Sequence, residues 1–206
     1  MKMISIIPAR MGSTRFPGKP MAEIHGMPMI GHVYKRVKLC EELDEVYVAT
    51  CDKEIYDYIE SIGGKAVMTS SSHERCSDRC AEAMLKIEND TNEKCDIIVM
   101  VQGDEPLTHP NMIKEAVEPM MEDSNILITN LAGKLNTIAD YESPNEVKAV
   151  MDKEWNALYF SREPIPSKKK FDDEIPMYKQ VPVIPFQRDF LLKYNEIEPT
   201  PLEIIE

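Results

Sequence analysis

Short apolar runs alternate with amphipathic stretches through the first two thirds of the chain. The runs predict buried strands at residues 4–7, 45–50, 65–68, 96–101 and 125–131. Helical spacing of apolar residues follows at 29–37, 55–62, 77–88 and 110–121, and Ser77 is the predicted N-cap of the third helix. Because strands and helices alternate, we predict an α/β fold with a mostly parallel, Rossmann-like sheet and helices on both faces.

The pattern changes at about Gly133. Short β-like runs at 146–151, 157–161 and 181–186 are joined by proline-rich loops, and a helix around Leu191 follows. Two prolines in the last run, Pro182 and Pro185, remove backbone donors and predict an edge or irregular strand. We therefore divide the chain into an α/β domain at 1–132 and a smaller β-rich part at 133–206 of the same globule.

A basic loop lies between the first strand and the first helix. Residues 8–20 contain two glycines and five side chains that suit phosphate: Arg10, Ser13, Thr14, Arg15 and Lys19. Glycines let backbone N–H groups turn toward an anion, and the cations neutralise its charge. The loop therefore predicts a polyphosphate site, with a solvated basic loop as the alternative. It matches neither the Walker A pattern nor the dinucleotide glycine fingerprint, which disfavours a dehydrogenase.

A carboxylate follows the most apolar strand. Asp104 lies in Gln-Gly-Asp-Glu-Pro, directly after residues 96–101. Ligands of open parallel sheets bind at the carboxyl ends of the strands, and Mg²⁺ often takes one or two carboxylates together with substrate phosphates. Asp104 is therefore a candidate Mg²⁺ ligand opposite the basic loop, although a turn aspartate is the alternative.

The composition of the chain limits the kinds of partner that we expect and its cellular location. The 206 residues carry 36 acidic and 24 basic side chains, a net charge of −12, which argues against nucleic-acid and membrane surfaces. Five cysteines without a Cys-x-x-Cys spacing indicate reduced thiols. We find neither a signal segment nor the ~18 continuous apolar residues of a membrane span. We therefore expect a cytoplasmic protein.

Several motifs together resemble one enzyme family. Val-Gln-Gly-Asp-Glu-Pro at 101–106 and Pro-Ala-Arg-Met-Gly-Ser-Thr-Arg-Phe-Pro-Gly-Lys-Pro at 8–20 resemble signatures of the 3-deoxy-manno-octulosonate (Kdo) cytidylyltransferases. Segments at 68–73, 78–82, 144–148 and 157–162 resemble further motifs, in order along the chain. The resemblance implies transfer of CMP from CTP to Kdo, an eight-carbon acidic sugar, with release of pyrophosphate, for lipopolysaccharide or capsule-type glycan synthesis.

The resemblance also implies residue roles. Arg10, Lys19 and Asp104 are the implied catalytic residues, and Asp104 is the implied Mg²⁺ ligand. The implied CTP-binding residues are Arg10, Ser13, Thr14, Arg15, Lys19, Thr69, Ser77, Arg79 and Gln102. The part at 133–206 is expected to bind the sugar acid and to form a homodimer.

Three departures from the family pattern keep alternatives open. Arg75-Cys76-Ser77 stands where the family has Ser-Gly-Thr, which alters backbone contacts to cytosine. Gln180, Pro182 and Ile184 replace a His, a Gly and a Tyr near the sugar. The family also continues past the Pro-Leu-Glu segment to a second metal-binding Asp, so either the sequence is truncated or the metal site is incomplete. A different acidic sugar (8-amino-Kdo or a sialic-acid relative) and a catalytically impaired nucleotide binder are the alternative functions.

Overall fold

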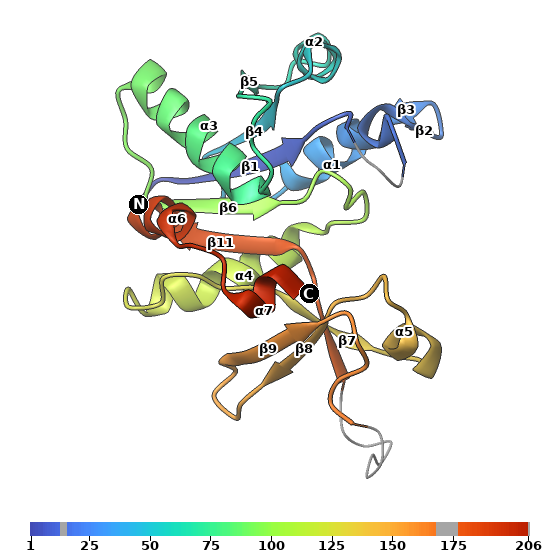
Figure 1. Cartoon of the computed structure of the whole chain (residues 1–206). Coiled ribbons are helices and arrows are strands. Elements are labelled where there is room, and N and C mark those ends of the chain that lie inside the picture. Colours follow the sequence, from blue (N-terminus) through green and yellow to red (C-terminus); the bar gives the residue numbers. More distant parts are fainter. Residues whose placement is uncertain (13–15, 168–176, 206) are drawn as a thin grey trace. The chain divides into compact units, whose positions relative to one another are not determined.

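The computed structural model describes residues 1–12, 16–167 and 177–205, and the chain forms two compact units (Figure 1). Unit 1 contains Met1–Thr129 and Pro182–Ile197, and unit 2 contains Asn130–Val181 and Glu198–Glu206. The chain therefore leaves unit 1 after Thr129, returns to it at Pro182 and leaves it again after Ile197.

Unit 1 is built on a five-stranded sheet in the order β11-β6-β1-β4-β5. Its strands are β1 (Met3–Ala9), β4 (Glu45–Thr50), β5 (Ala66–Met68), β6 (Ile97–Val101) and β11 (Val183–Gln187). The first four are parallel, and β11 pairs antiparallel with β6 at one edge. Every residue of β1 and of β6 is buried, which explains their continuous apolar sequences. The predicted mostly parallel sheet is confirmed.

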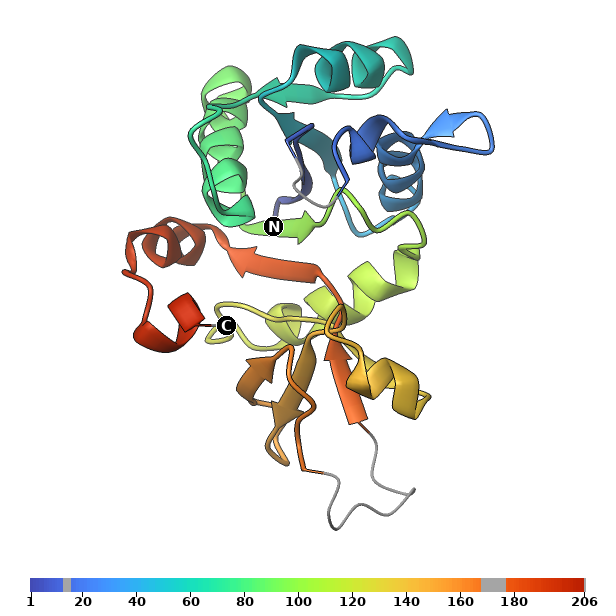
Figure 2. The same cartoon turned by 45° about the vertical axis from the view of Figure 1, so that its right-hand side comes forward.

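Helices cover both faces of this sheet (Figures 1 and 2). They are α1 (Met29–Val37), α2 (Lys53–Ser61), α3 (Cys76–Thr91), α4 (Pro110–Glu122) and α6 (Arg188–Glu196), with a short 3₁₀ helix η1 (Lys19–Met21) and a small hairpin of β2 (Glu23–Ile24) and β3 (Met27–Pro28). One core lies between the sheet and the pair α3 and α6, where Ile6, Met84, Ile98, Phe186 and Leu191 are buried together. The alternating pattern of the sequence thus produces the predicted layers.

Two local predictions in unit 1 are wrong. Residues 125–131 form no strand but run beside β11 through one bridge, Ile128 to Phe186. Thr129 N donates to Pro185 O at 3.1 Å, and because proline has no N–H the ladder gains no bond from that residue in return. Ser77 is not an N-cap: α3 begins at Cys76 after Arg75, so Ser77 lies in the first turn. The predicted edge position of the proline-containing strand is confirmed by β11.

Unit 2 is a four-stranded antiparallel sheet in the order β7-β10-β8-β9. Its elements are β7 (Ala132–Leu135), β8 (Lys148–Met151), β9 (Ala157–Ser161), β10 (Met177–Gln180), α5 (Ile138–Glu142) and α7 (Pro201–Ile205). The ammonium of buried Lys148 donates to the carbonyls of Ser143, Glu146 and Arg162, which satisfies a charge inside the unit. The strands predicted at 146–151 and 157–161 are confirmed, whereas β7, β10 and α5 escaped the sequence analysis.

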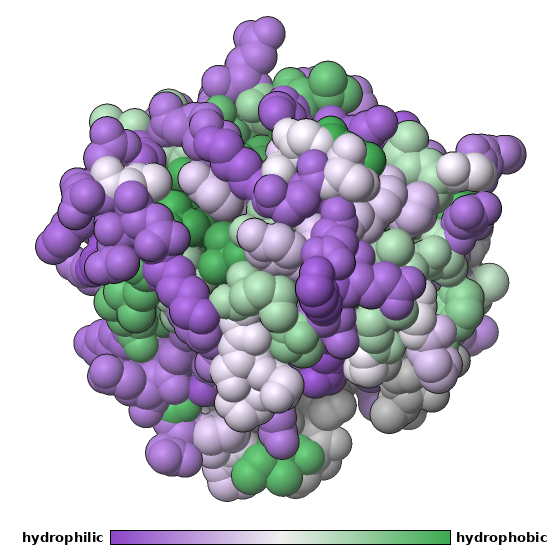
Figure 3. All heavy atoms as spheres, turned by 90° about the horizontal axis from the view of Figure 1, so that it is seen from above, coloured by the Kyte–Doolittle hydropathy of each residue, from purple (hydrophilic) through white to green (hydrophobic). Residues whose placement is uncertain are grey.

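The surface combines hydrophilic and hydrophobic side chains. The face seen in Figure 3 carries mostly hydrophilic side chains, with smaller hydrophobic groups between them. Across residues 1–12, 16–167 and 177–205, no helix combines the length and apolar character that a membrane crossing requires.

Candidate active site at the carboxyl ends of the parallel strands

The basic loop after β1 is anchored to the neighbouring strand. Met11 N donates to Asp52 Oδ2 at 2.8 Å, and Asp52 N donates to Thr50 Oγ1 at the end of β4 (3.1 Å). Gly18 N donates to Met11 O at 3.0 Å and closes the loop before η1. Met11 and Gly18, on either side of the residues that are not described, are therefore held near the carboxyl ends of β1 and β4, where ligands of open α/β sheets bind. Three of its predicted ligands, Ser13, Thr14 and Arg15, lie outside the described residues.

A tight turn follows β6. Gln102 N donates to Pro182 O at 3.2 Å, and Glu105 N donates to Gln102 O at 3.2 Å. A Cβ atom on Gly103 would lie 2.8 Å from Pro8 O and 3.3 Å from the Ala9 Cβ, closer than backbone tolerates. Glycine therefore lets this turn pack directly against the end of β1.

That packing brings together two of the three predicted catalytic residues. Lys19 Nζ lies 2.7 Å from Asp104 Oδ2, and the two side chains are 35% and 43% exposed. Arg10 is exposed at the end of β1. The structure thus places a carboxylate and two cations, from segments far apart in the sequence, at one edge of the sheet.

A third side of the site comes from β5 and α3. Arg79 is 3% exposed, and its Nη1 donates to Thr69 Oγ1 and to Ser70 O. Within the described part of the chain, Arg79 Nη2 is buried without a hydrogen-bond partner. Ser77 is also buried, and its carbonyl accepts a hydrogen bond from Asn195 Nδ2. Thr69, Ser77 and Arg79 therefore lie at or beside the N-terminal end of α3.

Cys76 connects this side to the turn after β6. Its thiol donates to Gln102 Oε1 at 3.4 Å. Burial raises the pKa of the Cys76 thiol, while the charges of Arg10 and Arg79 offset part of that rise. Asp104 raises the pKa further. One thiol thus responds to charges from the loop, the turn and the helix, which shows that these segments converge.

A carboxylate supports the segment between β5 and α3. Glu82 accepts hydrogen bonds from Ser70 N (2.9 Å) and from His73 Nε2, and its other oxygen lies 2.7 Å from Lys86 Nζ. Burial by itself would raise the pKa of Glu82, but the hydrogen bonds from Lys86, Ser70 and His73 outweigh it and lower the pKa to about 2. The ionised carboxylate therefore holds this segment against α3.

The donor set for a metal is small. Across the residues that the structure describes, no group of three or more His, Cys, Asp or Glu side chains could hold a metal ion alone. Asp104 offers one partly exposed carboxylate beside the basic loop. Such a site suits Mg²⁺ that takes its remaining ligands from substrate phosphates and water.

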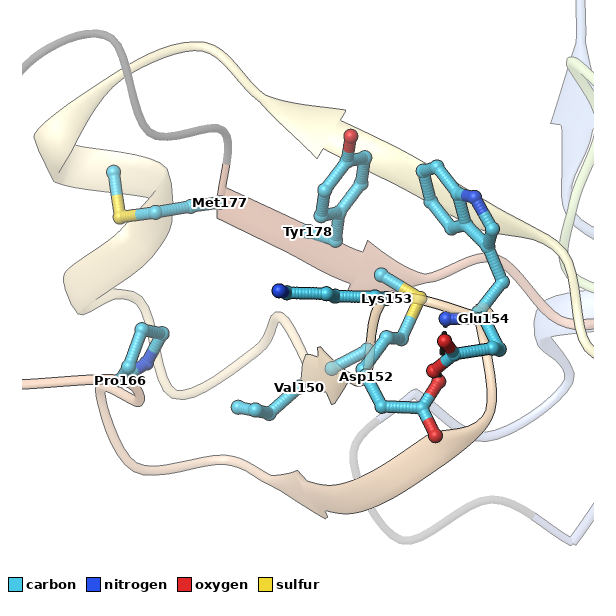
Figure 4. Close-up of a pocket in the computed structure, with 10 residues that line it drawn as sticks. Val150, Asp152, Lys153, Glu154, Pro166, Met177 and Tyr178 are labelled. Atoms are coloured by element: carbon cyan, nitrogen blue, oxygen red, sulfur yellow. Dashed lines mark hydrogen bonds between the residues drawn. The ribbon is translucent and has the colours of Figure 1, made fainter.

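A cavity of about 700 Å³ lies in unit 2 (Figure 4). Its lining comes mainly from β8, the turn after it and β10: Ala149, Val150, Met151, Asp152, Lys153, Glu154, Trp155, Pro166, Met177 and Tyr178. Trp155 and Tyr178 meet edge to face, with ring centroids 5.6 Å apart. The cavity belongs to an antiparallel sheet and lacks the cluster of cations, so it is not the candidate site for nucleotide chemistry.

Sequence reasoning missed three residues that build the site. Asp52 follows a predicted strand end, as Asp104 does, and that parallel was the available signal. Glu82 and His73 lie nine residues apart in the chain, and their contact depends on how the segment before α3 folds back. No periodicity in the sequence reports such a contact.

Comparison with known proteins decides the family. The chain matches the cytidylyltransferase family over residues 4–206. It belongs to this family. The cytidylyltransferase fold thus accounts for almost the whole chain, including both units.

Named relatives are similar over the full chain. A 3-deoxy-manno-octulosonate cytidylyltransferase of Geobacter metallireducens is 44% identical, covering 100% of this chain and 83% of the relative. A protein of the same name from Thermodesulfovibrio yellowstonii is 42% identical, also over 100% of this chain and 83% of the relative. Among solved structures, a CMP:2-keto-3-deoxy-manno-octonic acid synthetase complexed with CTP superposes with a TM-score of 0.89 at 35% identity, covering 100% of this chain and 82% of that one.

Proposed function

We propose that this cytidylyltransferase transfers CMP from CTP to Kdo and releases pyrophosphate, as a step in lipopolysaccharide or capsule-type glycan synthesis. One observation carries the proposal: Lys19 and Asp104 meet at 2.7 Å at the carboxyl ends of β1 and β6, beside Arg10. Cations and a carboxylate at that edge suit a metal-bound triphosphate. Relatives that carry the name 3-deoxy-manno-octulosonate cytidylyltransferase and are 42–44% identical over this whole chain support the choice of substrates.

The residues have distinct roles in this proposal. Arg10, Arg15 and Lys19 neutralise the triphosphate, and Ser13 and Thr14 offer hydroxyl donors to it. Thr69, Ser77, Arg79 and Gln102 contact the nucleotide and orient it. Asp104 would hold Mg²⁺, which supplies charge neutralisation at the phosphates when bound.

The reaction is a substitution at phosphorus. The anomeric hydroxyl of the sugar attacks the α-phosphorus of CTP, the bond to the bridging oxygen of the β-phosphate breaks, and pyrophosphate leaves. The hydroxyl proton passes to solvent or to a phosphate oxygen. The work of the protein is positioning and neutralisation of the negative charge that moves to the leaving group.

A second sugar acid, 8-amino-Kdo, is a candidate substrate. Gln180 stands where the resembling family has a His, and its Nε2 donates to Asn130 Oδ1 at 2.6 Å within unit 2. An amide engaged in this way presents different groups to a sugar than an imidazole does. This contact favours testing 8-amino-Kdo beside Kdo.

We further propose that the protein acts as a cytoplasmic homodimer. The β8–β9 hairpin exposes Trp155 and Leu158 by 65% and 64%, and a second copy of the chain would cover them. The five cysteines are all free thiols, as expected in the reducing environment of the cytoplasm.

The test measures pyrophosphate release from CTP with Kdo or 8-amino-Kdo, with Mg²⁺ and with EDTA. Asp104→Asn should lower turnover by about 100-fold or more, because a metal ligand is lost. It should scarcely change thermal stability, because an exposed ion pair contributes little. Asp57→Asn is the matched control, since it removes another exposed ion pair, that with Lys53 at 2.6 Å.

Full turnover in EDTA, or wild-type turnover by Asp104→Asn, would remove Asp104 from the metal site. Binding of CTP without turnover of either sugar would instead favour a nucleotide-binding protein. Faster turnover of 8-amino-Kdo than of Kdo would assign the amino sugar as the substrate.

A further inference from the structure

The side chain of Gln102 is held at one end only. Its backbone is fixed by the bonds to Pro182 and Glu105, and by the close packing of Gly103 on β1. Its amide oxygen accepts a hydrogen bond from the Cys76 thiol at 3.4 Å. Among the residues that the structure describes, Gln102 Nε2 has no hydrogen-bond partner.

An amide that can rotate by 180° presents either two N–H donors or a carbonyl oxygen to a ligand. The site surrounding Gln102 is built for anionic oxygen, with Arg10 and Lys19 on the neighbouring loop. The orientation with Nε2 toward the ligand donates to such oxygens, whereas the flipped orientation turns one acceptor against another. A hydrogen-bond donor that binds Gln102 Oε1 therefore favours the orientation in which Nε2 faces the ligand.

The thiol of Cys76 is suited to this task. Burial keeps its pKa above the ordinary value, so at neutral pH the sulfur carries a proton that it can donate. Cys76 begins α3, the helix that also carries buried Arg79 with its unpartnered Nη2, so the thiol lies on the nucleotide side of the site. The Gly that the resembling family has at this position offers no side-chain donor.

We propose that Cys76 is a positioning residue for nucleotidyl transfer, which acts by fixing the amide of Gln102 so that Nε2 faces the substrate. This inference rests on the proposed function. Cys76 itself touches no reacting atom in it, and its whole effect passes through Gln102.

The experiment compares Cys76→Ala, Cys76→Ser, Gln102→Ala and the double variant Cys76→Ala/Gln102→Ala by steady-state kinetics. Cys76→Ala should lower kcat/KM by about three- to tenfold, the size expected for the loss of one weak hydrogen bond. Cys76→Ser should restore most of it, because a hydroxyl also donates. Cys76→Ala should have no further effect once Gln102 is Ala, which a merely structural role would not produce.

Cys80→Ala is the matched control. It removes a thiol from the same helix one turn further on, where Cys80 is fully buried in the core. It should lower thermal stability at least as much as Cys76→Ala does and leave kcat/KM within twofold of wild type.

Three results would overturn the inference: unchanged kinetics of Cys76→Ala, an equal loss in the Gln102→Ala background, or a Ser variant as impaired as the Ala variant. All of them presuppose a wild-type protein that turns over CTP. A wild-type protein without turnover would contradict the proposed function instead, so the two failures are distinguishable.

Discussion

At the scale of single residues, Gly103 decides where Asp104 lies. The residue has no positive φ angle, so its role is steric: the turn after β6 approaches Pro8 O too closely for any side chain. Packing between β6 and β1 thus explains the glycine of this motif. Because Asp104 is the next residue in the chain, the same packing places its carboxylate close to the end of β1.

Gly103→Ala should therefore destabilise the protein by about 1 to 3 kcal/mol, the usual effect of overpacking. Denaturant unfolding followed by circular dichroism measures this free energy. Gly12→Ala is the control, because nothing lies within 4 Å of its Cβ position. Equal stability of the two variants would show that the turn relaxes away from β1 at little cost.

The sequence predicted that Lys19 and Asp104 lie together, but its prediction of Ser77 as an N-cap was wrong for a physical reason. Lys19 and Asp104 followed strand ends, and parallel strands bring such ends together, so their meeting was predictable. Ser77 was predicted as an N-cap from residue type alone. The helix begins one residue earlier, and Ser77 is buried with its carbonyl accepting from Asn195, 118 residues later in the chain. Contacts of that separation leave no local signal.

At the scale of elements, the segment joining β5 to α3 depends on one carboxylate. The Glu82 carboxylate accepts hydrogen bonds from Ser70 N and His73 and forms an ion pair with Lys86, and its side chain is 25% exposed. Because its pKa is about 2 in the folded protein and near 4.5 when unfolded, ionised Glu82 stabilises the fold. That contribution is complete above pH 4.5 and disappears as the pH falls toward 2.

Glu82→Gln should accordingly lower the free energy of unfolding by about 1 kcal/mol at pH 7, an amount reduced by solvent screening. The difference from wild type should shrink between pH 4.5 and pH 2. Urea unfolding at a series of pH values checks both statements. Asp90→Asn, an exposed carboxylate on the same helix, is the control. A pH-independent difference would mean that shape rather than charge matters at Glu82.

Elements were predictable where one face or both faces are buried. The apolar run of β6 predicted a buried strand, the helical spacing of α3 predicted an amphipathic helix, and both elements are present. By contrast, β7 contains Ala, Gly and Lys among its four residues and forms through pairing with β10. Residues 125–131 have the sequence of a strand, but beside β11 they form a single bridge, and Pro185, which has no N–H, cannot return the hydrogen bond that it accepts from Thr129. Pairing is a property of two segments, and the periodicity of one segment does not report it.

At the scale of the whole molecule, the single tryptophan offers a test of the proposed dimer. Trp155 has a positive φ of 65°, a conformation uncommon outside glycine, at the end of the β8–β9 hairpin. The turn is held by Asp152, whose carboxylate accepts from Glu154 N and Asn156 N. A hairpin that holds an aromatic side chain 65% exposed is suited to an interface.

If the protein dimerises through this hairpin, Trp155→Ala should raise the dimer dissociation constant by about tenfold or more. Sedimentation velocity measures the constant, and the tryptophan emission of the wild-type protein should shift to shorter wavelength as its concentration rises. Leu39→Ala, an exposed apolar side chain of unit 1 (66%), is the control. An unchanged dissociation constant, or emission independent of concentration, would exclude the hairpin from the interface.

The departure of the chain from unit 1 after Thr129 and its return at Pro182 have a consequence in chain entropy. The two crossing segments are joined, since Val181 N donates to Leu131 O at 2.8 Å and Gln180 pairs with Ala132. When unit 2 is folded, the two points at which the chain leaves and re-enters unit 1 are therefore connected as closely as if only a few residues lay between them. An unfolded unit 2 is a flexible loop more than tenfold longer, whose closure costs roughly 2 kcal/mol more. Folding of unit 2 thus stabilises unit 1 through the covalent chain alone, and the sheet that ends in Asp104 gains stability from strands that carry none of its charges.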